Sequence, residues 1–303
     1  MNFQKIPPVE GQAFFLDLAF RKAREKVASK KKLPKEILMR TRTKEILKID
    51  VTKDILTSRL SKILAVFPGT STLPIFYQDL INLTLDFKKL KASFGAMDWA
   101  IKQLNKLHML YFKKIRKEKH AEKLNAITLQ YYGRVSSVIK QIDKNFSYLE
   151  HTRQVMRTYP DIKELPTICL YGFPNVGKTT LLNALTGTNA KIAAYSFTTI
   201  SINAGYFTEN EKKIQVLDVP GTLAREKHND IELQAELVLN EVADLIIYVF
   251  DLSDTCGYPI EKQVELYKTI SEKKDTVIFL SKKDLLNKDI IDSFPQPHLS
   301  LED

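Results

Sequence analysis

The chain has 303 residues, enough for two domains, and its 44% hydrophobic and 27% charged residues exclude a largely disordered protein. Its net charge of +10 is unevenly distributed along the chain, which points to contact of one part with a polyanion. No apolar run approaches the ~20 residues of a membrane span, no secretory signal is visible, and two cysteines are too few for a disulfide framework, so we expect a cytoplasmic protein without a structural metal.

Helical periodicity dominates the first 160 residues. From Leu124 to Leu149, apolar residues recur at intervals of three or four, which predicts one face of a single long helix. The same spacing predicts earlier helices, with prolines at several breaks and a further break around Gly95. The expected helical segments are 14–20 with a basic extension, 55–67, 74–91, 96–115 and 124–149. Together they predict an antiparallel helical bundle.

The pattern changes after Pro160. Short runs rich in β-branched and aromatic residues alternate with helical segments, which is typical of an α/β sheet with crossover helices. The expected strands are 167–171, 201–207, 213–218, 245–250 and 276–280. The sequence thus predicts a helical domain over residues 1–160 and an α/β domain with a mostly parallel sheet over residues 161–303.

The two halves differ in charge. Residues 1–160 contain 32 Lys and Arg against 14 Asp and Glu, a net +18, whereas the remainder contains 14 against 22, a net −8. An excess that covers a whole domain favours contact of the helical half with nucleic acid. The alternative is that Lys-rich helices are merely well solvated. Basic groups lie at 21–24, 30–32 and 113–117, in or beside the predicted helices.

A phosphate-binding motif opens the α/β half. Residues 172–179, GFPNVGKT, match G-x-x-x-x-G-K-[ST] and stand between a predicted strand and a helical run at 180–186. Glycines allow backbone N–H groups to surround phosphate oxygens at the helix N-terminus. Lys178 would contact the β- and γ-phosphates, and the Thr179 hydroxyl would ligate Mg²⁺. The motif therefore predicts nucleotide binding.

Three further segments complete a candidate nucleotide site. Asp218, at the end of a predicted strand, can hold the water shell of Mg²⁺, and the N–H of Gly221 can face the γ-phosphate. Thr199, preferred over Thr198, offers a hydroxyl to the same ion. Asp284 follows the strand at 276–280, where a carboxylate can pair with N1 and the amino group of guanine, which predicts a preference for GTP and GDP.

The order of these segments resembles that of the P-loop GTPases. GFPNVGKT, YSFTT at 195–199 and DVPG at 218–221 are similar to the Obg-related branch. DLSDTCGY at 251–258, RQVMR at 153–157 and the opening MNFQKIPP are similar to the nucleolar GTP-binding protein 1 (Nog) family in its short, archaeal-like form. The resemblance covers essentially the whole chain. It implies a GTPase that assembles the large ribosomal subunit, binds rRNA and ribosomal proteins, and is monomeric when free.

The motifs and the resemblance together assign the site residues. The candidates for nucleotide binding are Gly172, Phe173, Pro174, Asn175, Val176, Gly177, Lys178, Thr179, Thr180, Asp218, Gly221, Lys282, Asp284, Ser300 and Leu301. The catalytic candidates are Lys178, Thr199, Gly221 and Asn175, and the Mg²⁺ ligands are Thr179, Thr199 and Asp218. In relatives with Pro-Asn-x-Gly-Lys in this loop, the asparagine helps to hold K⁺, which implies that role for Asn175; alternatively, Asn175 only shapes the loop.

The chain departs from the family pattern in the base-binding segments. Ser281 stands where the family has an asparagine that braces the P-loop and reaches the base, so weaker or less selective guanine binding is expected. Residues 299–303 would form a last strand and the base loop, with Ser300 and Leu301 under the guanine. No closing helix follows, so we expect either a fragment or a minimal domain.

The chain also lacks a glutamine at the usual position for orienting water. Thr222 and Leu223 follow Gly221, so slow intrinsic hydrolysis is expected. Two functions stay open: a GTPase that switches the RNA-binding half, and an RNA-binding scaffold with a structural, weakly hydrolysing nucleotide site. The segment 256–258, Cys-Gly-Tyr, has no predicted role beyond a tight turn before a helix.

Overall fold

The computed structural model describes residues 3–69, 72–187, 193–197, 200–220 and 230–300. This part of the chain forms two compact units. The helical unit contains residues 4–72 and 85–157, within the described ranges. The sheet unit contains Phe3, Leu73–Thr84 and the chain from Thr158 onward. A short segment from the N-terminal half of the sequence therefore belongs to the same compact unit as the sheet.

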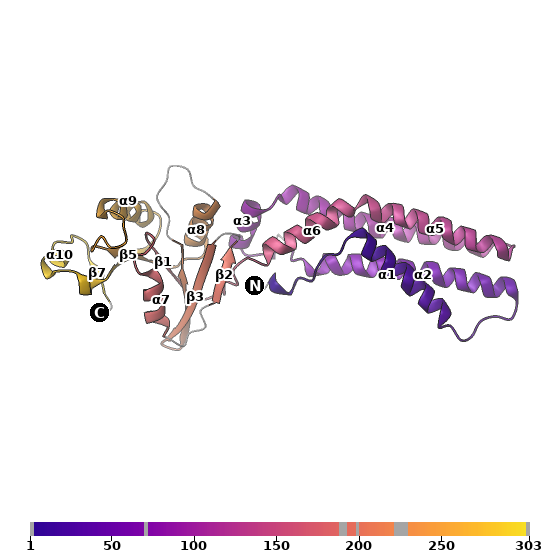
Figure 1. Cartoon of the computed structure of the whole chain (residues 1–303), viewed down its shortest axis with the longest axis horizontal. Coiled ribbons are helices and arrows are strands. Elements are labelled where there is room, and N and C mark those ends of the chain that lie inside the picture. Colours follow the sequence, from indigo (N-terminus) through magenta and orange to yellow (C-terminus); the bar gives the residue numbers. More distant parts are fainter. Residues whose placement is uncertain (1–2, 70–71, 188–192, 198–199, 221–229, 301–303) are drawn as a thin grey trace. The chain divides into compact units, whose positions relative to one another are not determined.

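Long helices build the helical unit. They are α1 (Gln12–Ala28), α2 (Ile37–Val66), α4 (Phe87–Lys117), α5 (Ala121–Gln141) and α6 (Asp143–Met156). Helices α2, α4 and α5 pack against one another along their lengths (Figure 1), and α1 packs on α2. Each helix buries one apolar stripe, as a bundle requires; in α4 it consists of Leu90, Met97, Ala100, Leu104, Tyr111 and Ile115. The expected helical bundle is confirmed.

One expected helix break is wrong, because the chain breaks before Gly95 rather than at it. The segment expected as one helix at 74–91 contains the end of α3 (Ile75–Thr84) and the start of α4. Asp86 caps α4, since its carboxylate accepts a hydrogen bond from the backbone N–H of Lys89 at 3.0 Å. Gly95 lies inside α4 with nothing near the position of a Cβ atom, where a helical glycine costs only ~1 kcal/mol.

The single helix expected over 124–149 is also wrong, because it is two helices. Ile142 leaves helical geometry at φ −100° and ψ 10°, so α5 ends and α6 begins there. The apolar stripe continues through the break because Ile142 is itself buried. The three-and-four spacing of apolar residues therefore continues across the break between α5 and α6, which is why the spacing alone did not show it. In addition, α2 starts at Ile37, well before the expected segment at 55–67.

The sheet unit has strands in the order β2-β3-β4-β1-β5-β6-β7. Their bounds are β1 Thr167–Tyr171, β2 Ala193–Phe197, β3 Ile200–Glu209, β4 Lys212–Asp218, β5 Leu245–Asp251, β6 Thr276–Ser281 and β7 His298–Leu299. Strands β4, β1, β5, β6 and β7 pair in parallel, whereas β2–β3 and β3–β4 are antiparallel. The expected mostly parallel sheet is confirmed, although β2 was not among the expected strands.

Helices connect the parallel strands. The bounds are α7 Lys178–Thr186, α8 Asp230–Glu241, α9 Ile260–Ser271 and α10 Lys288–Asp292, with a short 3₁₀ helix, η3, at Lys283–Leu285. The carboxyl ends of parallel strands meet at one edge of a sheet, where ligands bind in open α/β folds. In this sheet that edge brings together the chain after β1, Asp218 at the end of β4, Asp251 at the end of β5 and Ser281 at the end of β6.

Helix α3 is the part of the N-terminal half that packs in the sheet unit, against α8 (Figure 1). Its Tyr77 is buried, and the hydroxyl donates to the carbonyl of Pro160 at 2.8 Å and accepts from the N–H of Ile162 at 3.1 Å. Phe3 packs edge-on against Tyr77 and Tyr159, with ring centroids 5.2 and 5.6 Å apart. These contacts attach α3 to the segment that leads into β1.

Candidate nucleotide-binding site

The loop between β1 and α7 has the backbone of a phosphate cradle. Gly172 has φ +142°, and a Cβ atom there would lie 2.6 Å from the carbonyl oxygen of Val249, so only glycine fits. Gly177, with φ +98°, caps α7, and Asn175 has φ +62°. Residues with positive φ at three places in this loop turn backbone N–H groups inward at a helix N-terminus, which is the arrangement that binds phosphate oxygens.

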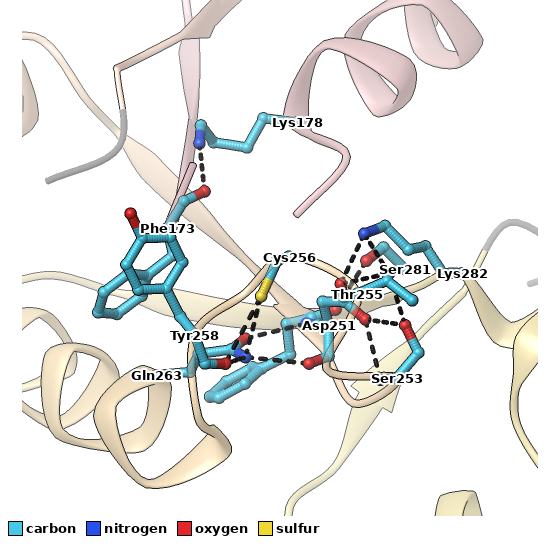
Figure 2. Close-up of polar contacts among 11 residues, drawn as sticks. Phe173, Lys178, Asp251, Ser253, Thr255, Cys256, Tyr258, Gln263, Ser281 and Lys282 are labelled. Carbon is cyan, nitrogen blue, oxygen red and sulfur yellow. Dashed lines mark hydrogen bonds and ion pairs between the residues drawn. The ribbon is translucent and has the colours of Figure 1, made fainter. Parts of the chain in front are cut away.

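Lys178 lies across this loop. It is 8% exposed, and its ammonium donates a hydrogen bond to the carbonyl oxygen of Phe173 at 2.7 Å (Figure 2) and another to that of Gly172 at 3.1 Å. Burial lowers the pKa of Lys178 to about 8, against the weaker opposing effect of Asp218. An anion in the loop would give this desolvated charge a partner, which favours binding of phosphate.

Thr179 and Asp218 meet beside the loop. The Thr179 hydroxyl, in the first turn of α7, donates to Oδ2 of Asp218 at the end of β4 at 2.6 Å. The same carboxylate oxygen accepts a hydrogen bond from the amide of Asn203 at 3.3 Å. Hydroxyl and carboxylate oxygens are ligands that Mg²⁺ prefers, so the pair fits that ion.

Asn203 is a site residue that the sequence analysis missed. It lies directly opposite Asp218 in the antiparallel register of β3 and β4. The signal was available only once that register was known, because Asn203 stands fifteen residues before Asp218 in the chain. Its amide orients the carboxylate that is expected to serve the metal.

Ser281 supports the phosphate loop from behind. A Cβ atom on Gly177 would lie 3.5 Å from the Cβ of Ser281, so the two residues are in contact distance. The Ser281 hydroxyl donates to the carbonyl of Phe250 at 2.8 Å, within the sheet. Between these elements is a cavity of about 310 Å³, lined by Gly177, Thr180, Leu181, Phe279, Leu280, Ser281, Lys282, Lys283 and Asp284.

Two of the candidate base-binding residues, Lys282 and Asp284, line that cavity. Asp284 lies in η3, its side chain is exposed, and within the described residues its carboxylate accepts no hydrogen bond. Lys282 has φ +54° and directs its ammonium to Asp251 at 2.6 Å and Thr255 at 2.7 Å. Ser300 is 6% exposed and accepts a hydrogen bond from Lys283 at 2.8 Å. The structure thus brings the predicted base loop beside the phosphate loop.

The remaining predicted residues divide into two groups. Phe173 and Val176 are buried, Pro174 is half-buried, and Asn175, Thr179 and Thr180 are exposed at the loop. The other predicted residues lie outside the described part of the chain; they are Thr198, Thr199, Gly221, Thr222, Leu223 and Leu301.

Two families match the chain, and their limits follow the two halves of the sequence. The family described as the NOG1 N-terminal helical domain matches residues 3–163, more than half of the chain. The family described as 50S ribosome-binding GTPase matches residues 167–283. The chain belongs to the nucleolar GTP-binding protein 1 (Nog) family. The expected resemblance is confirmed, and the chain is a GTP-binding member of this family.

Two relatives are similar to this chain over nearly its whole length. An uncharacterized protein of Methanocaldococcus jannaschii is 36% identical over 294 residues, which cover 95% of this chain and 82% of that protein. Nucleolar GTP-binding protein 1 of Encephalitozoon cuniculi is 30% identical over 94% of this chain and 55% of that protein. Among solved structures, the G domain of the T. maritima FeoB iron transporter is 28% identical over 44% of this chain and 85% of that chain, with a TM-score of 0.37.

The Nog relatives change one expectation. The cytoplasmic location expected from the sequence is wrong by this comparison, because the eukaryotic relatives are named for the nucleolus. The chain spans about half the length of these named proteins. Within the described residues, no helix has both the length and the apolar character that a membrane crossing requires.

Proposed function

We propose that this Nog family member hydrolyses GTP and acts in assembly of the large ribosomal subunit, with its basic helical unit bound to rRNA. The observation that best supports the nucleotide site is the buried Lys178, which lies across a loop with several positive φ angles and next to the Thr179–Asp218 pair. The descriptions of the matching families, one of which names a 50S ribosome-binding GTPase, support the ribosomal assignment.

In this proposal each group at the phosphate loop has one task. Backbone N–H groups and Lys178 hold the β- and γ-phosphates, and the α7 N-terminus adds its dipole. Thr179 and Asp218 would hold Mg²⁺, which, when bound, neutralises charge on the phosphate oxygens. Asn203 keeps the Asp218 carboxylate oriented, and Ser281 limits movement of Gly177.

Single-turnover GTP hydrolysis tests the enzymatic part. We expect slow hydrolysis by the free protein and faster hydrolysis when purified large subunits are present, because no glutamine follows Gly221 to orient water. Lys178→Ala should remove hydrolysis under both conditions. Hydrolysis that large subunits fail to stimulate would contradict the assembly-factor function.

A second candidate function is an RNA-binding scaffold with a structural nucleotide site. The observation that favours it is the Ser281 hydroxyl, which is used within the sheet on Phe250. If the scaffold is correct, GDP and GTP stabilise the protein against thermal unfolding, but phosphate release in the single-turnover assay is weak and large subunits do not accelerate it. Phosphate release that large subunits accelerate would exclude the scaffold.

We further propose that Asn175 holds a potassium ion against the phosphates in place of a catalytic glutamine. Asn175 is exposed and has φ +62°, a backbone conformation that asparagine and glycine adopt more readily than other residues. A cation there would neutralise charge during phosphoryl transfer, a task worth ~10³–10⁵ in rate when an arginine performs it. We expect faster hydrolysis in KCl than in NaCl at matched ionic strength. Asn175→Gly, which keeps the backbone, should abolish the difference, whereas equal rates in the two salts would contradict the role.

The charged surface of α4 supports RNA binding by the helical unit. Lys102, Lys106, Lys113 and Lys117 recur at intervals of four or seven residues, so they share one face of α4, and all four are exposed. Next to them a cavity of about 510 Å³ is lined by His108, Met109, Phe112, Lys113, Arg116 and Lys117. Arg116 lies over the Phe112 ring, 5.7 Å from its centroid. Cations for phosphates beside an aromatic surface for bases match single-stranded or irregular RNA.

A further inference from the structure

The loop at residues 251–258 begins at Asp251, the last residue of β5, and contacts both nucleotide-binding loops (Figure 2). It contains the Cys256-Gly257-Tyr258 segment for which the sequence suggested only a tight turn. Its first residue, Asp251, contacts the base loop, and its last, Tyr258, contacts the phosphate loop. One short element therefore connects the two parts of the site.

Asp251 is the centre of the polar contacts in this loop. Its side chain is fully buried. Oδ1 accepts hydrogen bonds from the backbone N–H of Ser253 at 2.9 Å and from the Ser253 hydroxyl at 2.5 Å. Oδ2 accepts from Thr255 at 3.1 Å and from the Lys282 ammonium at 2.6 Å. Burial opposes ionisation, yet Lys282 and Ser253 hold the pKa of Asp251 below its usual value, so the carboxylate is charged.

Lys282 is held at both its backbone and its side chain. Its ammonium has two acceptors in the 251–258 loop, Asp251 and Thr255. Its backbone has φ +54°, a conformation that a non-glycine residue keeps only when its surroundings support it. Lys282 directly precedes η3, so its position sets where Asp284 enters the cavity.

Tyr258 and Gln263 fix the other end of the loop. The Tyr258 ring lies 4.8 Å from the ring of Phe173 in the phosphate loop. The buried Gln263 amide donates to the carbonyls of Asp251 at 3.0 Å and Tyr258 at 3.1 Å, and its oxygen accepts from the N–H of Asp251 at 3.0 Å. The loop is thus cross-linked by hydrogen bonds, with little freedom to move either contact.

We infer that Asp251 is a positioning residue for the guanine base, because its carboxylate holds Lys282 and, through it, the turn that carries Asp284. This inference rests on the proposed GTP-binding function. It assigns to Asp251 the bracing of the base loop, where Ser281 supplies only a short side chain bonded within the sheet. Loss of the Asp251 charge should therefore affect recognition of the base and spare recognition of the phosphates.

The test measures affinities of the full chain for GDP and ADP by fluorescence titration. Asp251→Asn keeps the shape and removes the charge, so we expect GDP affinity to fall about tenfold, the loss expected when one buried charged hydrogen bond is disturbed, with ADP affinity unchanged. Asp254→Asn is the matched control, because Asp254 is exposed in the same loop and its φ of +56° suits asparagine equally well. It should leave both affinities unchanged.

Three outcomes overturn the inference. The first is an unchanged ratio of GDP to ADP affinity in Asp251→Asn, and the second is equal loss of both affinities, the sign of a merely structural role. The third is an additive effect of two substitutions. Because Asp251 is inferred to act through Lys282, Asp251→Asn should not change the ratio of GDP to ADP affinity any further in a Lys282→Met background, and a further change would overturn the inference. If Asp251→Asn does not fold, Thr255→Val is used in its place. The preference for GDP over ADP should then fall about threefold, because one acceptor of Lys282 is lost. Equal affinity of the unmodified protein for GDP and ADP would instead contradict the proposed function.

Discussion

Lys178 predicts proton uptake on nucleotide binding. Its pKa of about 8 in the free protein means that about half of the molecules carry a neutral amine at pH 8. A bound diphosphate favours the ammonium, so binding at pH 8 should take up about half a proton, and at pH 7 about a tenth. Calorimetry of GDP binding in buffers of different ionisation enthalpy measures this number. Absence of uptake at pH 8 would show that phosphate does not meet Lys178.

The same pKa has a consequence for stability without nucleotide. The pKa of folded Lys178 lies below its ordinary value of 10.5, so the unfolded chain binds more protons between about pH 8 and that value. The burial cost of the charge is present below pH 8 and is relieved as the pH rises through this window. Lys178 therefore contributes an increase in stability with pH, while nucleotide affinity decreases over the same range.

Asp284 predicts the choice of base. Its exposed carboxylate borders the 310 Å³ cavity, where it can accept hydrogen bonds from N1 and the amino group of guanine. Adenine offers no donor at N1, and an unmet hydrogen bond costs ~1–3 kcal/mol, about tenfold to a hundredfold in affinity. Competition between GDP and ADP measures the preference. Asp284→Asn should reduce GDP affinity and raise affinity for xanthosine diphosphate, and failure of this shift would separate Asp284 from the base.

At the scale of elements, β3 and α7 approach each other closely at Gly205. A Cβ atom on Gly205 would lie 2.5 Å from a Thr186 methyl group. Gly205→Ala should therefore destabilise the sheet unit by about 1–3 kcal/mol, the usual cost of overpacking. Urea denaturation followed by far-ultraviolet circular dichroism measures the change in the free energy of unfolding. Thr186→Ala in the same chain should restore most of the loss, and equal destabilisation with and without Thr186→Ala would contradict this contact.

Strands were easier to predict than helix ends. The bounds of β1 were predicted from a run of apolar residues between polar segments, and those of β4, β5 and β6 were predicted to within a residue. Helix ends depended on side-chain caps and local dihedral angles, such as Asp86 before α4 and Ile142 between α5 and α6, which hydrophobic spacing does not register. Strand β2 lies in a Ser/Thr-rich segment whose pairing depends on β3.

The same division applies to the site. The P-loop is contiguous in sequence, and both Gly172 and Lys178 lie where the motif predicts. Asn203, Asp251 and Tyr258 act across strands and loops, so their contacts depend on the register of β3 with β4 and on the turn after β5. Their partners were individually visible in the sequence, but the pairing was not.

At the scale of the whole molecule, the charge distribution predicts a salt dependence for RNA binding. Each phosphate contact contributes a slope of about −0.7 to −0.9 in log K against log salt concentration. Replacing the exposed cations Lys113, Lys114, Arg116 and Lys117 by glutamine in the full chain should flatten the slope by up to about 3. Filter binding of rRNA over a salt series measures it.

A matched variant of the sheet unit provides the control. Lys212, Lys213, Lys262 and Lys268 are also exposed, and their replacement by glutamine changes the net charge by the same amount. The slope should remain that of the unmodified protein. If both variants flatten the slope equally, RNA binding depends on net charge alone and the surface of α4 has no special part in it.

The packing of α3 within the sheet unit limits which parts of the gene can be exchanged between relatives by recombination. The polypeptide passes between the two compact units four times, near residues 3, 72, 85 and 157. A recombination event with a single crossover near residue 160 would therefore join a sheet unit to a foreign α3, whose buried Phe76, Tyr77, Leu80 and Ile81 would then meet surfaces they did not co-evolve with. Exchange of the nucleotide-binding half between distant relatives would require three segments to move together, so the two halves should share one genealogy. Phylogenies built separately from residues 85–157 and 167–283 should have the same branching order.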